Sequence, residues 1–413
     1  MTMSTKDRET IRGLAERYAE ISQLDVQQER IDRYYKTNAL KAVRPVVLIS
    51  EVPWGEIQDE ALVNTCSGEL QGIEGNLRRT LYQWEHFQVD TVVPPVFSVM
   101  KRSRSTGIGI RVEETQIQSE TGTNISAHEY VDILKTEEDL AKVQIPEVSY
   151  NKEGTEQALE LASEVFDGIM PVELHGHALQ YNIWDVIARY RGVDSLLMDL
   201  AMRPEFMHQI AARFTEVVEA VFSQTEALGL LDPQQTLLHC TVACSNELPA
   251  ADFDGTVRRK DVWGRCAAQI FGSVSPDMHD EFDLAYNEKT FGGCGLLYYG
   301  CCEPMDLKID ILRKRFKNLR KVSITPWANP ERAAAAMGKD LVMAAKPNPA
   351  NVSSSTFNPT IVEEEISGYL DACKRHGTPC EFVLKDISTI ANNPDTLTQW
   401  AATVKGVIDR YCA

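Results

Sequence analysis

Short apolar runs and longer amphipathic stretches alternate along most of the chain. The apolar runs have the length of strands and are rich in β-branched residues, which is typical of strands buried on both faces. They lie at residues 44–50, 91–99, 169–177, 236–244, 295–302, 321–325, 340–347 and 381–386. The stretches between them predict helices, most clearly over residues 204–228, 361–376 and 396–411. Such alternation predicts a parallel sheet with helical crossovers, and the number of units favours an α/β fold closed into a (β/α)8 TIM barrel.

Two segments lie outside this alternation. Residues 5–36 carry a single apolar stripe at helical spacing, which predicts an N-terminal helical arm over residues 1–44. The stripe must be covered, either by the rest of the chain or by a second copy in a homodimer. Residues 100–150 resemble a hairpin followed by a short capped helix, so we interpret them as a small insertion over the mouth of the barrel. Residues 45–413 are then one barrel domain with that insertion.

Composition and charge narrow the functional classes. A formal net charge of −18 argues against nucleic-acid binding, because neutralising phosphates requires a concentrated basic face. The notable basic cluster, Lys101, Arg102 and Arg104, follows an apolar run and predicts either a solvated loop or an anion site. The first residues lack the apolar core of a secretory signal and no long apolar span follows, so we expect a cytoplasmic protein that does not enter a membrane. The ten scattered cysteines favour thiols or metal ligands over a disulfide framework.

In a (β/α)8 barrel the active site lies at the carboxyl ends of the strands, and several of the predicted strands end in ionisable groups. Glu173, His175 and His177 occupy alternate positions and therefore one face of their strand. Hydrogen bonding to neighbouring strands is an equally good reason for such residues. No glycine-rich phosphate motif follows a strand, which argues against a nucleotide-dependent enzyme.

Soft ligands follow two further runs. Residues 236–244 contain His239, Cys240 and Cys244, and residues 295–303 contain Tyr298, Tyr299, Cys301, Cys302 and Glu303. Thiolate, imidazole and carboxylate together suit a tetrahedral zinc ion, although no paired C-x-x-C or H-E-x-x-H motif is present. Burial as a small hydrophobe is the alternative for each cysteine taken alone. In a regular strand Cys301 and Cys302 point to opposite faces, so we expect only one of them at the site.

In residues 167–218, DGIMPVELHGHALQYN is followed by helices and by a Pro-Glu helix start in RPEF. This segment resembles the first half of the barrel of the uroporphyrinogen decarboxylase superfamily, on the branch of the corrinoid-dependent methyltransferases. Residues 273–291, beginning SVSPDMHDEF, resemble its Ser-Pro-initiated helix. GLLYYGCCEP then falls where the zinc methyltransferases of the superfamily carry His-x-Cys-Gly. The resemblance spans roughly residues 80–411 and implies the same barrel.

The chain departs from the superfamily at two places. No counterpart of the arginine-rich motif that grips uroporphyrinogen is found, which argues against haem biosynthesis. Cys301 matches the middle zinc ligand, but Tyr299 stands at the histidine and FVLKDIST has no cysteine for the last ligand. A metal would therefore use other residues. As metal ligands we expect Cys301, Cys240, His239 and Glu173; as catalytic residues His177, Tyr299 and Glu303; and as substrate-binding residues His175, Arg102 and Arg104.

The resemblance implies a zinc-dependent methyltransferase that moves a methyl group between a small methylated substrate and a corrinoid (cobalamin) protein. The donor could be an aromatic methyl ether, in which case the reaction is an O-demethylation. One alternative is a metal-independent decarboxylase or other lyase in which Arg102 or Arg104 holds a carboxylate. The other is a non-catalytic protein that binds a tetrapyrrole or a corrinoid.

Overall fold

The computed structural model describes residues 4–41, 44–118 and 126–412. Seven strands form a curled sheet in which every neighbouring pair is parallel. Their order is β1 (Val46–Ile49), β15 (Cys380–Leu384), β14 (Val342–Ala345), β13 (Leu319–Ile324), β12 (Leu296–Tyr299), β11 (Trp263–Cys266) and β8 (Leu179–Gln180). This arrangement confirms the predicted parallel βα pattern as a half-barrel.

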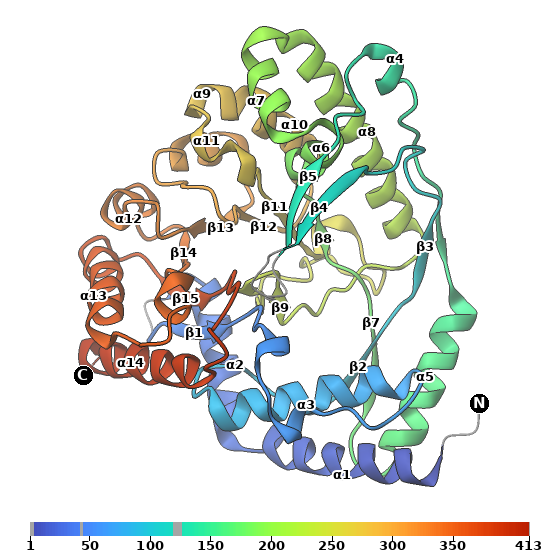
Figure 1. Cartoon of the computed structure of the whole chain (residues 1–413), viewed down its shortest axis with the longest axis vertical. Helices are drawn as coiled ribbons and strands as arrows, with labels where there is room; N and C mark the ends of the chain where they lie inside the picture. Colours follow the sequence, from blue (N-terminus) through green and yellow to red (C-terminus); the bar gives the residue numbers. More distant parts are fainter. Residues whose placement is uncertain (1–3, 42–43, 119–125, 413) are drawn as a thin grey trace.

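Eightfold closure stays a prediction. β2 (Phe97–Met100) and β7 (Val172–His175) form a separate parallel pair, and they lie apart from β1 in Figure 1. The remaining pairs are antiparallel: β3 (Ser103–Ser105) with β6 (Val148–Tyr150), β4 (Glu114–Gln118) with β5 (Ser126–Tyr130), and β9 (Leu237–Leu238) with β10 (Thr241–Val242). The sequence pattern missed β11 because its four residues, WGRC, contain a glycine and an arginine and form no apolar run.

Helices form the outside of the fold, around the sheet and around the β2–β7 pair (Figure 1). They are α1 (Thr5–Ser22), α2 (Asp25–Asn38), α3 (Leu70–His86), α4 (Glu137–Leu140), α5 (Lys152–Phe166), α6 (Ile183–Arg191), α7 (Val193–Met202), α8 (Pro204–Ala227), α9 (Pro276–His279), α10 (Ala285–Phe291), α11 (Ile309–Arg315), α12 (Pro330–Met337), α13 (Pro359–His376) and α14 (Asp395–Cys412). Single turns are η1 (Trp54–Glu56), η2 (Glu60–Leu62), η3 (Arg259–Asp261), η4 (Gln269–Ser273), η5 (Asp280–Leu284) and η6 (Pro349–Val352). The main apolar core lies between these helices and the sheet. Within the described ranges, no helix combines the length and the apolar character that a membrane crossing requires.

The N-terminal arm is helical, as its stripe predicts, and it is divided into two helices, α1 and α2. Ile11, Leu14 and Tyr18 on α1 are buried in a satellite core with residues of α3 and α5. The stripe is therefore covered by this chain itself. The predicted insertion contains β3, β4, β5, α4 and β6, of which β5 contacts α6. Residues 1–3 and 42–43 of the arm and residues 119–125 of the insertion lie outside the described residues.

An antiparallel hairpin occupies the interior of the curled sheet. The prediction that residues 236–244 form one barrel strand is wrong, because Cys240 has a φ of +58° and the chain turns back there. Leu238 packs against inward-facing side chains of β11, β12 and β14, and Val242 packs against those of β1 and β15. The two-residue loop of His239 and Cys240 is therefore the tip of a hairpin with apolar sides.

Buried charges hold this hairpin in place. Lys321 Nζ on β13 donates to Thr241 Oγ1 (2.8 Å), Val242 O (2.9 Å) and Glu381 Oε2 (2.9 Å). The Thr241 hydroxyl also donates to the Glu381 carboxylate on β15. Lys346, directly after β14, donates to the carbonyl of Cys240. Contacts near the start of β15 thus hold the middle of the hairpin, and a contact at the end of β14 holds its tip, which places the tip at the carboxyl edge of the sheet.

Candidate functional site

Two thiols, an ammonium group and a carboxylate meet at the carboxyl edge of the sheet. Lys385 Nζ, directly after β15, lies 2.8 Å from Cys301 Sγ, which follows β12. The two sulfur atoms of Cys301 and Cys302 are 3.6 Å apart. Asp386 Oδ2 accepts from Cys302 Sγ at 2.9 Å and lies 3.0 Å from Lys385 Nζ. Cys301 and Lys385 are each only 2% exposed, so their interaction is shielded from water.

The hairpin tip and the end of β1 add a second set of ligand atoms. One ligand atom each from Glu51, His239 and Cys240 lie within 4.8 Å of one another. Cys301 Sγ lies 3.9 Å from His239 Nε2, which joins this set to the thiol pair. The backbone N–H of Asp386 donates to Glu51 Oε2 at 2.8 Å and fixes that carboxylate. Carboxylate, imidazole and thiol groups of Glu51, His239 and Cys240 therefore form one compact set, and Cys301 adjoins it through His239.

Unusual backbone conformations collect at the same place. Glu51, Cys240 and Asp386 all have positive φ values, between +54° and +58°, which side chains other than glycine seldom adopt. Such conformations persist where the surrounding structure imposes them, and they concentrate at functional sites. Gly300, with a φ of +98°, turns the chain directly after β12. The expectation that Cys301 and Cys302 face opposite sides is wrong, because this turn ends the strand and both thiols reach the site.

The surrounding groups favour a deprotonated Cys301. The hydrogen bond from Cys302 lowers the pKa of the Cys301 thiol most, and His239, Lys385 and Arg265 lower it further against the opposing effect of burial. The same contact raises the pKa of Cys302 far above its ordinary value. Hydrogen bonds to Cys240 and Cys301 raise the pKa of His239 to about 9. The site therefore contains one sulfur that is readily ionised and one that retains its proton.

Further positive charge faces the interior near this site. Burial lowers the pKa of Lys346 to about 8, although Glu381 and Cys240 act in the opposite direction. Arg265 on β11 is 5% exposed and donates to Asn182 Oδ1 at 2.9 Å. Its Nε and Nη2 atoms are buried and have no hydrogen-bond partner within the described ranges. An unpaired buried guanidinium edge is costly, so it is a candidate for binding an anionic group.

Glu303 lies behind the site and supports it, whereas Tyr299 lies on the other face of the sheet. The Glu303 carboxylate accepts from the backbone N–H groups of Cys301 (3.0 Å) and Ala268 (3.1 Å), and it positions the turn that carries Cys301. Tyr299 points to the opposite face of the sheet, where its hydroxyl contacts His279 (2.6 Å) and donates to Asp283 (2.5 Å). The structure does not bring Tyr299 to the thiols, because adjacent strand positions alternate between the faces and Tyr298 takes the inner one.

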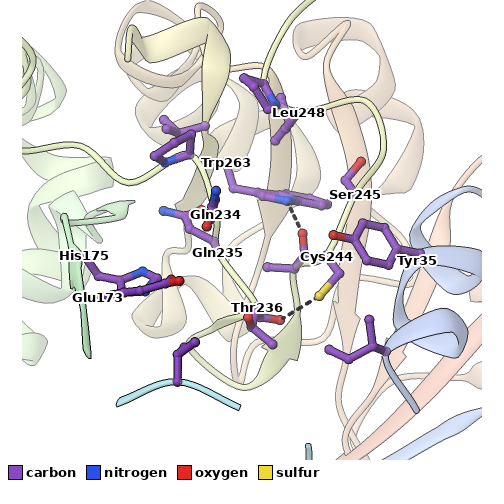
Figure 2. Close-up of a pocket in the computed structure, with 16 residues that line it drawn as sticks. Tyr35, Glu173, His175, Gln234, Gln235, Thr236, Cys244, Ser245, Leu248 and Trp263 are labelled. Carbon is purple, nitrogen blue, oxygen red and sulfur yellow. Dashed lines mark hydrogen bonds and ion pairs between the residues drawn. The ribbon is translucent and has the colours of Figure 1, made fainter. Parts of the chain in front are cut away.

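Glu173 and His175 belong to a different place, the pocket of Figure 2. Glu173 was predicted as a metal ligand, but it lies 3.7 Å from His175 on β7, whereas Glu51 supplies the carboxylate beside His239. β7 pairs with β2 and not with the seven-stranded sheet, so its side chains diverge from the thiols. His177 forms an isolated bridge with Leu231, and its buried Nε2 has no hydrogen-bond partner among the residues that the structure describes.

The two predicted substrate-binding arginines are also separate from the thiols. Arg102 forms an ion pair with Glu69 at 3.2 Å. Arg104 lies on the exposed strand β3, opposite Ser149 of β6. The structure thus brings Cys301, Cys240 and His239 together out of the predicted set, with Glu303 behind them, and it adds residues that sequence reasoning missed. The missed residues are Glu51, Arg265, Lys346, Lys385 and Asp386.

No protein-family model matches the chain, and no curated protein matches it. Among solved structures, a methyltransferase from Methanosarcina mazei is similar in fold, with 12% sequence identity and a TM-score of 0.48. The match covers 93% of this chain and 99% of the other. The chain is an α/β protein with a curled parallel sheet and a thiol-rich site at its carboxyl edge.

Proposed function

We propose that the chain is a zinc-dependent methyltransferase whose metal ligands are Glu51, His239, Cys240 and Cys301. The observation that carries this proposal is the group formed by Glu51, His239 and Cys240, with Cys301 Sγ 3.9 Å from His239 Nε2, at the edge where such sheets hold their active sites. Buried cysteines with a purely structural role would not require a carboxylate and an imidazole beside them.

The donor set fits zinc. Zinc prefers nitrogen and sulfur ligands with an occasional carboxylate, and three or four such ligands at one point are typical of its sites. The ligands are also oriented by a second layer of contacts. Asp386 N holds Glu51, Lys346 holds the carbonyl of Cys240, and the Glu303 carboxylate holds the backbone of Cys301.

A bound zinc ion would supply Lewis-acid chemistry, which activates an oxygen atom or keeps a thiol deprotonated. The protein groups contribute charge and proton control around it. Lys385 Nζ donates to Cys301 Sγ and stabilises negative charge on that sulfur. Cys302 retains its proton, and its single S–H has two acceptors in reach, Cys301 Sγ at 3.6 Å and Asp386 Oδ2 at 2.9 Å, so the two thiols have different protonation states. Glu51 and His239 keep 35% and 39% of their side-chain surface exposed, which leaves the site open to a small molecule.

A small methylated compound, such as an aromatic methyl ether, is the proposed donor, and a separate corrinoid protein is the proposed acceptor. Both follow from the superfamily that the sequence resembles. The open side of the site at Glu51 and His239 is the proposed point of entry for the donor.

Elemental analysis of the purified full-length chain tests the metal site. We expect about one zinc ion per chain, and Cys301→Ser and Cys240→Ser should each lose most of it, because a serine hydroxyl ionises far less readily than a thiol. Cys244→Ser is the matched control, since Cys244 lies at the other end of the same hairpin and bonds to Thr236 O. A metal-free wild type, or equal zinc in all these proteins, contradicts the proposal.

Turnover tests the reaction itself. The full-length chain is mixed with a reduced corrinoid and a panel of methyl ethers and methylated amines, and methylation of the corrinoid is followed by absorbance. We expect turnover with at least one donor and its loss in Cys301→Ser. Binding of the corrinoid without turnover on any donor would instead favour the non-catalytic alternative.

A metal-independent decarboxylase is the second candidate, and one observation favours it. The unpaired edge of Arg265 lies in the interior of the sheet near Cys301, where it could hold a substrate carboxylate. Arg265 thereby replaces Arg102 and Arg104 in that hypothesis. Release of carbon dioxide from a carboxylate substrate by zinc-free protein, lost in Arg265→Met, would select this function over methyl transfer.

A further inference from the structure

A pocket of about 480 Å³ lies behind the hairpin, and neither Cys301 nor Cys302 lines it. α2, β7 and the loop before the hairpin form its walls, and Thr236 and Cys244 contribute from the base of the hairpin (Figure 2). His239 and Cys240 are at the tip of that hairpin, and neither they nor Cys301 line the pocket. The volume suits a small molecule.

The charged groups at the pocket are acidic. Glu173 is acidic, and none of the described residues that line the pocket is a lysine or an arginine. His175 Nδ1 lies 2.9 Å from Asp232 Oδ2, so a second carboxylate stands directly behind the imidazole. An anionic ligand would meet repulsion from both acids, whereas a cation would be attracted.

Several polar atoms at the His175 end of the pocket make no hydrogen bond among the described residues. His175 Nε2 and both Gln235 side-chain atoms, Oε1 and Nε2, are buried and make no hydrogen bond within the described part of the chain. In the tautomer whose Nδ1–H donates to Asp232, the imidazole of His175 presents an Nε2 lone pair to the pocket. Leaving buried polar groups unpaired is costly, so a ligand that pairs with them would be favoured in the pocket.

We propose that this pocket binds a primary amine whose ammonium group donates to Glu173, His175 Nε2 and Gln235 Oε1. An ammonium group has three N–H donors, which matches these three acceptors in number, and its charge suits the acidic end. Figure 2 shows Glu173 and His175 together at one end, with Gln235 between them and Trp263. Leu248 and Trp263 line the other part of the pocket, so the body of the ligand is apolar or aromatic.

Calorimetric titration of the full-length chain with benzylamine tests this site. We expect saturable binding at millimolar concentrations. Glu173→Gln should weaken it about tenfold or more, because a charge-assisted hydrogen bond is lost. Gln235→Leu should weaken it as well. Benzyl alcohol, which lacks the charge, and benzyltrimethylammonium, which lacks the N–H donors, should both bind more weakly than benzylamine.

Two control variants separate this site from other effects. Glu160→Gln on α5 makes the same change in net charge at an exposed position outside the pocket and should leave the affinity unchanged. Cys301→Ser should also leave it unchanged, because Cys301 does not line the pocket; amine binding and methyl transfer can therefore fail independently. Absence of saturable binding, equal affinity for benzyl alcohol, or full affinity in folded Glu173→Gln and Gln235→Leu proteins would overturn the proposal.

Discussion

Replacing Lys321 by methionine tests whether the buried ion pair holds the hairpin. Lys321 and Glu381 are both fully buried, and Lys321 Nζ donates three hydrogen bonds of 2.8 to 2.9 Å. Lys321→Met leaves the Glu381 carboxylate with the Thr241 hydroxyl alone, whereas Val242 O keeps its bond from Asn38 Nδ2 at 3.1 Å. The loss is therefore dominated by an uncompensated buried charge.

An uncompensated buried charge costs about 3–5 kcal/mol. Because the Val242 carbonyl keeps a partner, we expect Lys321→Met to lower the free energy of unfolding by about 3–4 kcal/mol. Glu381→Gln should lower the free energy of unfolding by less, because Lys321 keeps two neutral acceptors and burial already lowers the pKa of Lys321. The double variant Lys321→Met/Glu381→Leu removes both charges and should lose only about 1 kcal/mol.

Urea unfolding followed by circular dichroism measures these changes, and the double-mutant cycle isolates the coupling between the two side chains. We expect a coupling of at least about 2 kcal/mol. A loss below about 1 kcal/mol in Lys321→Met, or a double variant that loses the sum of the two single variants, would refute the reasoning. The zinc content of each folded variant then shows whether the position of the hairpin tip depends on the pair.

Two further predictions concern stability. Burial, and after it the negative charge of Glu303, raises the pKa of Asp185 from 3.8 to about 7. The folded chain therefore binds this proton more tightly than the unfolded chain does. The free energy of unfolding should then fall as the pH rises from about 4 to about 7. Asp185→Asn should flatten that decline in urea titrations across this range, and an unchanged slope would contradict it. Removing residues 1–38 should lower the melting temperature, because it exposes the apolar faces of α3 and α5 that α1 covers; an unchanged melting temperature of the truncated chain would show that the arm is dispensable.

The rule that active sites follow the carboxyl ends of parallel strands identified part of the site from sequence. It selected Cys301, Cys240 and His239 because soft ligands stood at the ends of apolar runs. The rule did not select Lys385 and Asp386, although EFVLKD ends in these two charged residues, because the resemblance implied a cysteine ligand at the end of that strand. Glu51 follows the run RPVVLIS by one position, and that acidic residue was the available signal for the missing carboxylate.

Other site predictions were wrong although nothing in the local sequence indicated the error. Glu173 and His175 alternate on a strand just as a ligand pair would, but β7 pairs with β2 and carries them to a different pocket. Cys302 joins Cys301 because Gly300 ends the strand in a turn, which strand periodicity does not predict. Arg102 meets Glu69, a residue 33 positions away, and no spacing rule relates the two.

The sequence by itself determined the alternation of strands and helices over most of the chain, the parallel pairing that this alternation implies and the stretches that carry thiols, because these depend on periodicity and on groups close together along the chain. The tertiary structure decided that residues 236–244 fold as a hairpin inside the sheet, with the tip beside Cys301. That placement depends on contacts such as Lys321 with Glu381, 60 positions apart. A buried charge is stable only where the whole fold supplies its partner, and so the ligand set formed only when the chain had folded.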